Sequence, residues 1–516
     1  IPFYVDEILP GDTAQIDMGA AIRMSTPIYP VMDNAYMDIY FFFTPSRILW
    51  EHFEEFMGEN KLTAWEQPVE YEIPQIKAPE GGWIKGTIAD YMGIPTKVEN
   101  ISVSHLPFRR YCMIWNEWFR DQNVKDSAMV NLDDATVNGT NDGDYVINAQ
   151  LGAKPLKAAR FHSYFTSALP EAQKGPDILL PLGSWAPVQT RDEYLADPAG
   201  MRLAWRGIDG SAPITGAGKG TYVTIQDDNT SDAKGTYIHS SITGTYTKAV
   251  EPVNLWTDLS QAAGATINQL RQAFAIQRLY ERDARGGTRF REIMRAHFGV
   301  TSPDSRFQIP EYLGGARHRI NVDQVLQTSG TTETSPQGNT AAYSLTNFSD
   351  SVFTKSFTEP GYIIGVCCIR TDETYQQGIE RFWSRKSRFD FYWPALANIG
   401  EQPVYNKELY AQGTEEDDEV FGYQEAWADY RYKPSRVSGA FRSNYEQTLD
   451  SWHYANYFTE MPTLNSDFID TTRANVNRTI AVQDELEDQF IADFYVAAEY
   501  TRPMPLYSVP GLLDHN

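Results

Sequence analysis

Three short stretches concentrate arginine and lysine in a chain of 516 residues that is acidic overall, with a formal charge of −24 at pH 7. Two of them, residues 381–388 and 431–442, each hold four basic residues and no acid, and aromatic residues lie within and beside them. Cations that follow phosphates and rings that stack on unpaired bases are the combination that binds single-stranded nucleic acid. We name these stretches the first and second basic islands and expect nucleic-acid contacts from their cations: Arg381, Arg385, Lys386, Arg388, Arg431, Lys433, Arg436 and Arg442.

A structural alternative fits the same pattern, because aromatic residues also fill cores and arginines bridge subunits through bidentate bonds. The third island, residues 271–295, holds seven arginines against Glu281, Asp283 and Glu292. It is expected to serve subunit contacts or nucleic acid through Arg282, Arg285, Arg289 and Arg295. The pattern alone leaves both interpretations open.

Motifs for catalysis or metal binding fail on inspection. Residues 216–221 resemble a phosphate-binding loop but lack its first glycine, and Gly220 separates Lys219 from Thr221. Residues 138–144 resemble a calcium loop without the glutamate at its twelfth position. The eight histidines show no HxH or HExxH spacing, and no GxSxG occurs. We therefore expect no catalytic residue, no metal site and no cofactor.

The run of five acidic residues at positions 415–419 is expected to be a solvated loop, because packed carboxylates repel one another. A cation site or a subunit contact is the alternative interpretation. Neither alternative singles out a reaction.

Composition narrows the class of protein. With 42% hydrophobic and 22% charged residues, the chain is neither collagen-like, disordered nor a coiled coil. The acidic balance argues against nonspecific coating of nucleic acid. Three cysteines, of which Cys367 and Cys368 are adjacent, exclude a disulfide scaffold or zinc ribbon and fit a reducing compartment. The apolar run at 362–369 is too short to span a membrane, and no signal peptide is predicted, although no methionine opens the sequence.

The expected framework is mainly β-structure, a sandwich, barrel or jelly roll, with helices in its connections. The clearest predicted strands are residues 35–44, 361–371 and 388–393, and the predicted helices are residues 46–57, 106–122 and 266–284. Residues 207–250 are rich in Gly, Thr and Ser and hold only brief alternations, so they are expected to be an excursion, as are residues 131–150 and 327–350. Such an excursion is either a tolerated surface insertion or a binding surface.

Several long blocks of the sequence resemble the major capsid protein of microviruses, and within these the gokushoviruses, small tailless phages with circular single-stranded DNA. The similarity runs over nearly the whole chain and in the right order. The blocks are FYVDEILPGDT (3–13), PIYPVMDNAYMDIYFFFTPSRILWEHFEEFMGE (27–59), LPFRRYCMIWNEWFRDQN (106–123), QRLYERDARGGTRFREIMRAHFGVTSPDSRFQIPEYLGG (277–315) and RPMPLYSVPGLLDHN (502–516).

The resemblance implies an eight-stranded viral jelly roll with long loop and helical insertions, in a single domain over residues 1–516. It implies 60 copies in a T=1 icosahedral shell around single-stranded DNA, in a virion assembled in the host bacterial cytoplasm. Residues 207–250 take the place of an exterior insertion that forms threefold protrusions and serves host attachment. Its candidate recognition residues are Tyr222, Asp227, Asp228, Lys234 and Tyr237.

The resemblance also implies partners, and none involves membrane insertion. They are a minor capsid or DNA-pilot protein, an internal scaffolding protein, a small basic DNA-associated protein and a host surface receptor. The family's usual N-terminal arm ahead of Phe3 is not in this sequence, so any basic arm stays undecided. A different class of function, a carbohydrate-binding or carbohydrate-hydrolysing β protein, is the alternative, since rings stack on sugars and paired carboxylates cleave them.

Overall fold

The computed structural model describes residues 1–60, 69–176, 188–190, 205–207, 221–228, 235–242, 245–252, 255–257, 267–301, 308–481 and 488–504. The chain divides into two compact units. The first comprises residues 1–174 and 281–516, and the second comprises residues 175–280. The insertion expected at 207–250 lies within the second unit.

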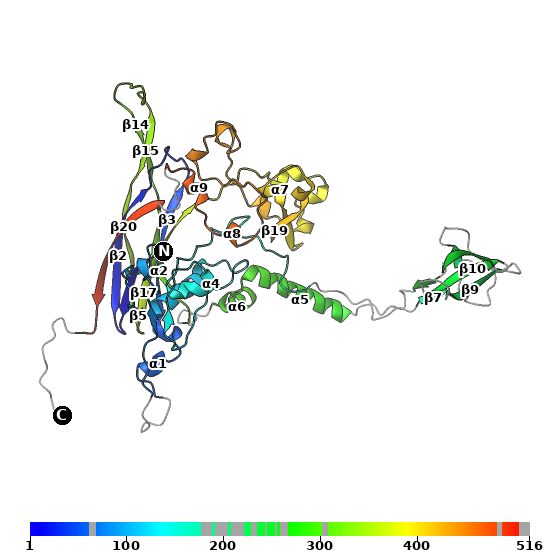
Figure 1. The fold of residues 1–516 in the computed structure, drawn as a ribbon, viewed down its shortest axis with the longest axis horizontal. Helices are drawn as coiled ribbons and strands as arrows, with labels where there is room; N and C mark the ends of the chain where they lie inside the picture. The colour runs from blue at the N-terminus through cyan, green and yellow to red at the C-terminus, as the bar shows by residue number, and fades with distance from the viewer. Residues whose placement is uncertain are drawn as a thin grey trace. The chain divides into compact units, whose positions relative to one another are not determined.

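Two antiparallel sheets form the framework of the first unit (Figure 1). Along strand β2 (Thr13–Met24), Ile16 and Met18 are buried while Gln15 is exposed, which is the period-two pattern of a strand with one face in a core. The buried side chains of both sheets meet in one cluster, so the sheets form the predicted β-sandwich. The first sheet has the order β1 (Pro2–Ile8), β17 (Gly361–Thr371), β3 (Ala35–Pro45), β13 (Glu311–Arg319), and the second has the order β16 (Thr346–Ser356), β2, β20 (Phe490–Thr501).

Strand β3 is buried on both faces. Ile39 and Phe41 enter the core between the sheets, whereas Phe42 enters a second core on the opposite face. Helix α3 (Leu106–Ile114) supplies Phe108 and Cys112 to that second core. The first unit therefore has three layers, two sheets and a helical layer.

Most of the strongest sequence predictions are confirmed. Residues 35–44 and 361–371 are β3 and β17, and residues 106–122 form α3 followed by a π-helical turn at Trp115–Phe119. The helix predicted at 266–284 is α5 (Ile267–Gly286), which begins in the second unit and ends in the first.

Two predictions are wrong. Residues 46–57 are not one helix but a 3-10 turn, Ser46–Ile48, and the short helix α1 (Phe53–Phe56), because Leu49 and Trp50 between them are both drawn into a core. Residues 388–393 are not a strand, because the Asp390 carboxylate accepts bonds from two backbone N–H groups and curls the chain into the 3-10 turn Arg388–Asp390.

Shorter elements connect the sheets of the first unit, and no helix among the described residues is long and apolar enough to cross a membrane. The connecting strands are β4 (Gln75–Lys77), β5 (Ser102–Ser104), β6 (Val137–Asn138), β14 (Val322–Leu326), β15 (Thr340–Ser344), β18 (Glu401–Tyr405) and β19 (Val420–Glu425). The connecting helices are α2 (Ile88–Tyr91), α4 (Tyr145–Asn148), α6 (Phe290–Phe298), α7 (Asn406–Leu409), α8 (Ser466–Ile469) and α9 (Ala474–Asn477). The polar stretches at 131–150 and 327–350 thus contain β6, α4 and β15 rather than structureless chain.

The second unit contains a four-stranded antiparallel sheet, which corrects the expectation of an excursion with only brief alternations. Its strand order is β8 (Trp205–Gly207), β11 (Thr245–Pro252), β10 (Gly235–Ile242), β9 (Thr221–Asp228). Alternating Thr, Tyr and Ile supply β propensity without a long apolar run. Gly207 pairs directly with Val250, so the two ends of the predicted insertion lie side by side. A second pair joins β7 (Val188–Thr190) to β12 (Leu255–Thr257).

The three cysteines carry free thiols. Cys112 is buried beneath β3, and Cys367 is buried between the sheets. Cys368, the next residue of β17, is partly buried and side chains of adjacent strand residues point to opposite faces.

A buried arginine joins α3 to two loops. The fully buried side chain of Arg109 donates from Nη1 to the Leu49 carbonyl (3.1 Å) and from Nη2 to the Asp133 carbonyl (2.9 Å). Its Nε donates to Nδ1 of His105 (3.2 Å), and because arginine only donates, that Nδ1 carries no proton. His105 Nε2 then donates to the Gln150 carbonyl (2.8 Å), so His105 is held as the neutral tautomer.

This arrangement predicts a pH dependence of stability. Burial, assisted by the Arg109 charge, lowers the pKa of His105 to about 4, against an ordinary value near 6.5 in the unfolded chain. As the pH falls, His105 therefore takes up a proton in the unfolded state before it does so in the folded state. This difference should lower the free energy of unfolding by roughly 3 kcal/mol between about pH 6.5 and pH 4. The Gln side chain of His105→Gln retains one donor and one acceptor but does not titrate. The variant should therefore lack this pH-dependent loss of unfolding free energy, which is measured by denaturant unfolding of dissociated subunits.

The matched control is His162→Gln at an exposed position, which should keep the wild-type pH dependence. Equal pH slopes for wild type and His105→Gln would contradict the assignment. Burial raises the pKa of carboxyls such as Glu373 and Glu408, which affects stability in the opposite direction as the pH falls. Comparing the two proteins at each pH cancels this contribution.

Candidate nucleic-acid interface

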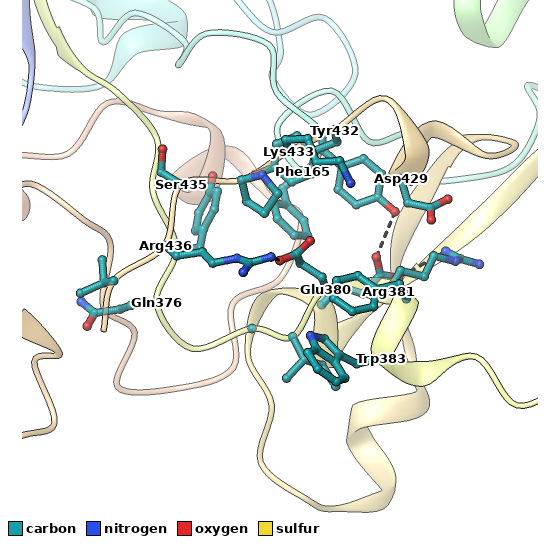
Figure 2. Close-up of a pocket in the computed structure, with 18 of the residues that line it drawn as sticks. Phe165, Gln376, Glu380, Arg381, Trp383, Asp429, Tyr432, Lys433, Ser435 and Arg436 are labelled. Carbon is teal, nitrogen blue, oxygen red and sulfur yellow. Dashed lines mark hydrogen bonds and ion pairs between the residues drawn. The ribbon is translucent and has the colours of Figure 1, made fainter. Parts of the chain in front are cut away.

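The structure brings the first and second basic islands together around one pocket (Figure 2). Its volume is about 430 Å³, within the range of roughly 300–1,000 Å³ usual for small-molecule sites. Five island cations line it: Arg381, Arg385, Lys433, Arg436 and Arg442. The aromatic residues that line it are Tyr164, Phe165, Tyr375, Phe382, Trp383, Tyr430 and Tyr432.

A close backbone contact positions the first island. The chain at Gln377 bridges to Tyr410 at the end of α7, and a Cβ on Gly378 would lie 2.0 Å from the Glu408 carbonyl oxygen. Because glycine alone tolerates this approach, the following 3-10 turn Arg381–Ser384 lies against α7. Arg381 Nη1 then meets the Glu408 carboxylate at 3.2 Å.

Ion pairs with described acids that lie outside both islands neutralise four of their eight cations, Arg381 among them. Arg385 pairs with Asp429 at 2.5 Å and its guanidinium lies over the Tyr430 ring, 4.3 Å from the centroid. Two further pairs, Arg431 with Glu425 and Arg436 with Glu380, complete the set. The islands are therefore acid-free in sequence but not in space.

Glu408 anchors the inner wall of the pocket. Besides Arg381, it accepts hydrogen bonds from the Tyr164 hydroxyl (3.0 Å) and the Tyr405 backbone N–H (3.1 Å). Burial raises the pKa of this carboxyl, and the Arg381 charge opposes the rise. Removing one partner of such a buried pair leaves an uncompensated charge, so Arg381 and Arg385 hold the fold.

The other four island cations are exposed and form no ion pair with a described carboxylate: Lys386, Arg388, Lys433 and Arg442. Arg388 lies over the neighbouring Phe389 ring at 4.8 Å, and Arg442 donates to the Gln376 carbonyl at 2.8 Å. Cations without carboxylate partners are the ones that can bind phosphate. The structure thus separates the predicted DNA contacts into fold-holding arginines and available cations.

Aromatic residues divide in the same way. Tyr164, Phe165 and Tyr375 belong to a buried cluster, as the structural alternative expected. Trp383, by contrast, is 72% exposed and contacts Phe382, with ring centroids 4.7 Å apart and the two planes tilted by 35°. Phe389 and Trp393 are exposed as well. Exposed rings beside cations without carboxylate partners make this surface a candidate for binding.

The third island lies away from this pocket in sequence and lines another, of about 580 Å³. Arg289 bonds to the Asn116 carbonyl (2.7 Å) and pairs with Glu117 (3.3 Å) and Glu292 (3.1 Å), while Arg285 pairs with Glu401. Arg282 and Arg295 are exposed and form no ion pair with a described carboxylate. Arg285 and Arg289 therefore have intrachain roles.

The remaining predicted sites fall as follows. Tyr222, Asp227 and Asp228 lie on β9 and Tyr237 on the adjacent β10, while Lys234 and most of the 216–221 motif lie outside the described residues. The acidic run lies in the 3-10 turn Glu415–Asp418 and its flank, and it is exposed as predicted except at Asp417, which is half-buried. In the part of the chain that is described, no three His, Cys, Asp or Glu side chains are arranged to hold a metal ion.

Sequence reasoning missed the acids that complete the pocket, Glu380, Glu408 and Asp429. Glu380 directly precedes the first island and Asp429 lies two residues before the second. Windows extended by two residues would have found both. Glu408, on α7, gives no such signal.

Comparisons with known proteins identify the family. The model of a family described as capsid protein (F protein) matches residues 1–512. The chain is 42% identical to capsid protein VP1 of Spiroplasma virus 4 over 99% of this chain and 92% of the relative. It is 41% identical to capsid protein VP1 of Bdellovibrio phage phiMH2K and 40% identical to that of Chlamydia phage 1, each over 99% of this chain, and 91% and 92% of those proteins.

These relatives are structural proteins, so the chain is a virion component of a phage shell and not an enzyme, and the carbohydrate-hydrolysing alternative is wrong. The sequence resemblance to gokushovirus major capsid proteins is confirmed. The chain belongs to the phage capsid protein (F protein) family.

Proposed function

We propose that this capsid protein is an eight-stranded jelly roll that assembles as 60 copies into a T=1 icosahedral shell around circular single-stranded DNA. The observation that carries the DNA role is the meeting of the two basic islands, with exposed cations beside exposed rings. The jelly roll is supported by two antiparallel sheets packed face to face, with the β14–β15 hairpin as a further pair.

Assembly takes place in the host bacterial cytoplasm, which the three free thiols support. A minor capsid or DNA-pilot protein, an internal scaffolding protein and a small basic DNA-associated protein take part. A basic partner is needed because each copy carries −24, so the shell adds negative charge to that of the genome. Electron microscopy and sedimentation of purified particles test the shell; a chain that stays monomeric under assembly conditions would refute it.

The exposed island cations give a test of DNA contact. The triple substitution K386A/R388A/K433A should lower the DNA content of particles while shells still form, since these side chains form no ion pair with a described carboxylate. Loss of three phosphate contacts should reduce the log–log salt slope of single-stranded DNA binding by about 2, at about 0.7 per contact. Full and empty particles are counted after sedimentation.

The matched control is Arg385→Ala, which leaves Asp429 buried without its cation and should reduce full and empty particles alike. If the triple variant also reduces both classes equally, these residues hold subunits together and do not contact DNA.

Residues 207–250 are proposed to serve host attachment. The pairing of strands in the second unit shows where they can be removed. Because Gly207 and Val250 are paired neighbours, residues 208–249 can be replaced by a two-residue Asn-Gly turn. Particles of this variant should assemble but adsorb poorly to host cells. Wild-type adsorption and infection by the variant would refute the receptor role, and exchange of the same residues for a Gly/Ser linker of equal length controls for insertion length.

A further inference from the structure

We propose that the pocket between the two basic islands binds one unpaired guanine base, with Glu380 as the acceptor for its Watson–Crick edge. This inference deepens the proposed enclosure of single-stranded DNA and rests on it. It assigns a base preference where the islands alone predict phosphate contacts and stacking without a preferred base.

The pocket offers a stacking surface and a carboxylate on the same side of one turn. The Trp383 backbone N–H donates to the Glu380 carbonyl at 3.0 Å, and side chains three residues apart lie on one side of a 3-10 turn. In Figure 2 the Glu380 side chain lies between Phe165 and Trp383. A base stacked on the exposed Trp383 ring would therefore direct an edge toward the Glu380 carboxylate.

Of the three carboxylates that line the described pocket, Glu380 is the one that a ligand can engage. Glu408 is held by Arg381 and Tyr164, and Asp429 is held by an arginine whose side chain is 10% exposed. The Glu380 side chain is 18% exposed, more than those of Glu408 and Asp429, and its partner is Arg436, whose side chain is 70% exposed. Because solvent surrounds the Arg436 end of this pair, a ligand can displace the guanidinium while Glu380 stays in place.

The hydrogen-bond donors on the Watson–Crick edge of each base determine which base the Glu380 carboxylate prefers. A carboxylate presents two acceptor oxygens and no donor, and it binds best to two adjacent N–H groups. Guanine presents that pair, N1–H and the N2 amino group, on its Watson–Crick edge. Adenine and cytosine each present a donor beside an acceptor, and thymine presents one N–H between two carbonyl oxygens, so each places a lone pair against Glu380.

The Arg436 guanidinium that the base displaces can bind the phosphate of the same nucleotide. Arg436 and the exposed Lys433 lie on the same segment of the pocket wall, where a guanidinium and an ammonium can bind the phosphate attached to the base. Binding therefore exchanges the Arg436–Glu380 pair for an Arg436–phosphate pair and a Glu380–guanine pair. Both new contacts are charge-assisted.

The experiment measures equilibrium binding of dGMP, dAMP, dCMP and dTMP to the full-length chain, as dissociated subunits, by calorimetry. Wild type should bind dGMP roughly tenfold or more tighter than the other three, as expected for two charge-assisted hydrogen bonds. Glu380→Gln, which presents one donor and one acceptor, should lose this preference and bind dAMP or dCMP at least as well as dGMP. Such a switch would not follow from misfolding.

Two further variants sharpen the result. Glu416→Gln, in the exposed acidic run, changes the same charge outside the pocket and should keep the wild-type order of nucleotides. Arg436→Ala should reduce the preference for dGMP over deoxyguanosine, since the phosphate contact is lost while Glu380 remains. An unchanged phosphate preference in Arg436→Ala would contradict the exchange of partners.

Failure of this inference can be told apart from failure of the proposed function. If the four nucleotides bind equally, or not at all, while K386A/R388A/K433A still lowers DNA content, the guanine site is refuted and DNA enclosure stands. If an arginine-bearing peptide binds in a Glu380-dependent manner and dGMP does not, the pocket receives a protein partner instead. Loss of guanine preference in Glu416→Gln would also overturn the assignment.

Discussion

The burial of strand β3 on both faces is the constraint on which the first unit depends. Its alternating side chains supply the core between the sheets on one side and the core against helix α3 on the other. Removing a ring such as Phe41 or Phe42 from a core costs on the order of 3–5 kcal/mol. Since β17 and β13 pair with the two edges of β3, a shift in its register would move side chains of both layers to the wrong face.

Charge is used for two separate purposes in this acidic chain. Carboxylates scattered through the sequence fix individual arginines, as Glu408 fixes Arg381 and Asp429 fixes Arg385. What remains available on the first two islands is a small set of exposed cations beside exposed rings. The surface therefore suits a few local contacts to a single strand rather than general neutralisation of a genome.

Sequence reasoning succeeded where the hydrophobic pattern of a single strand or helix ran without interruption. The apolar run of β17 and the helical spacing of α3 needed no tertiary information. It failed at Arg388–Trp393, where aromatic content favoured a strand but the Asp390 carboxylate captured backbone N–H groups and formed a turn. The pocket was half predictable, because clustering of cations and rings is visible in sequence, whereas the pairing of Arg381 with Glu408 depends on the close approach at Gly378.

The three free thiols have a consequence for the chemical durability of the particle. Burial raises the pKa of Cys112, Cys367 and Cys368, that of Cys367 to about 11. The thiolate is the form that oxidants and disulfides attack, so at neutral pH these residues offer almost none of it. Burial therefore protects these three side chains from oxidation and disulfide exchange for as long as the packing around them holds.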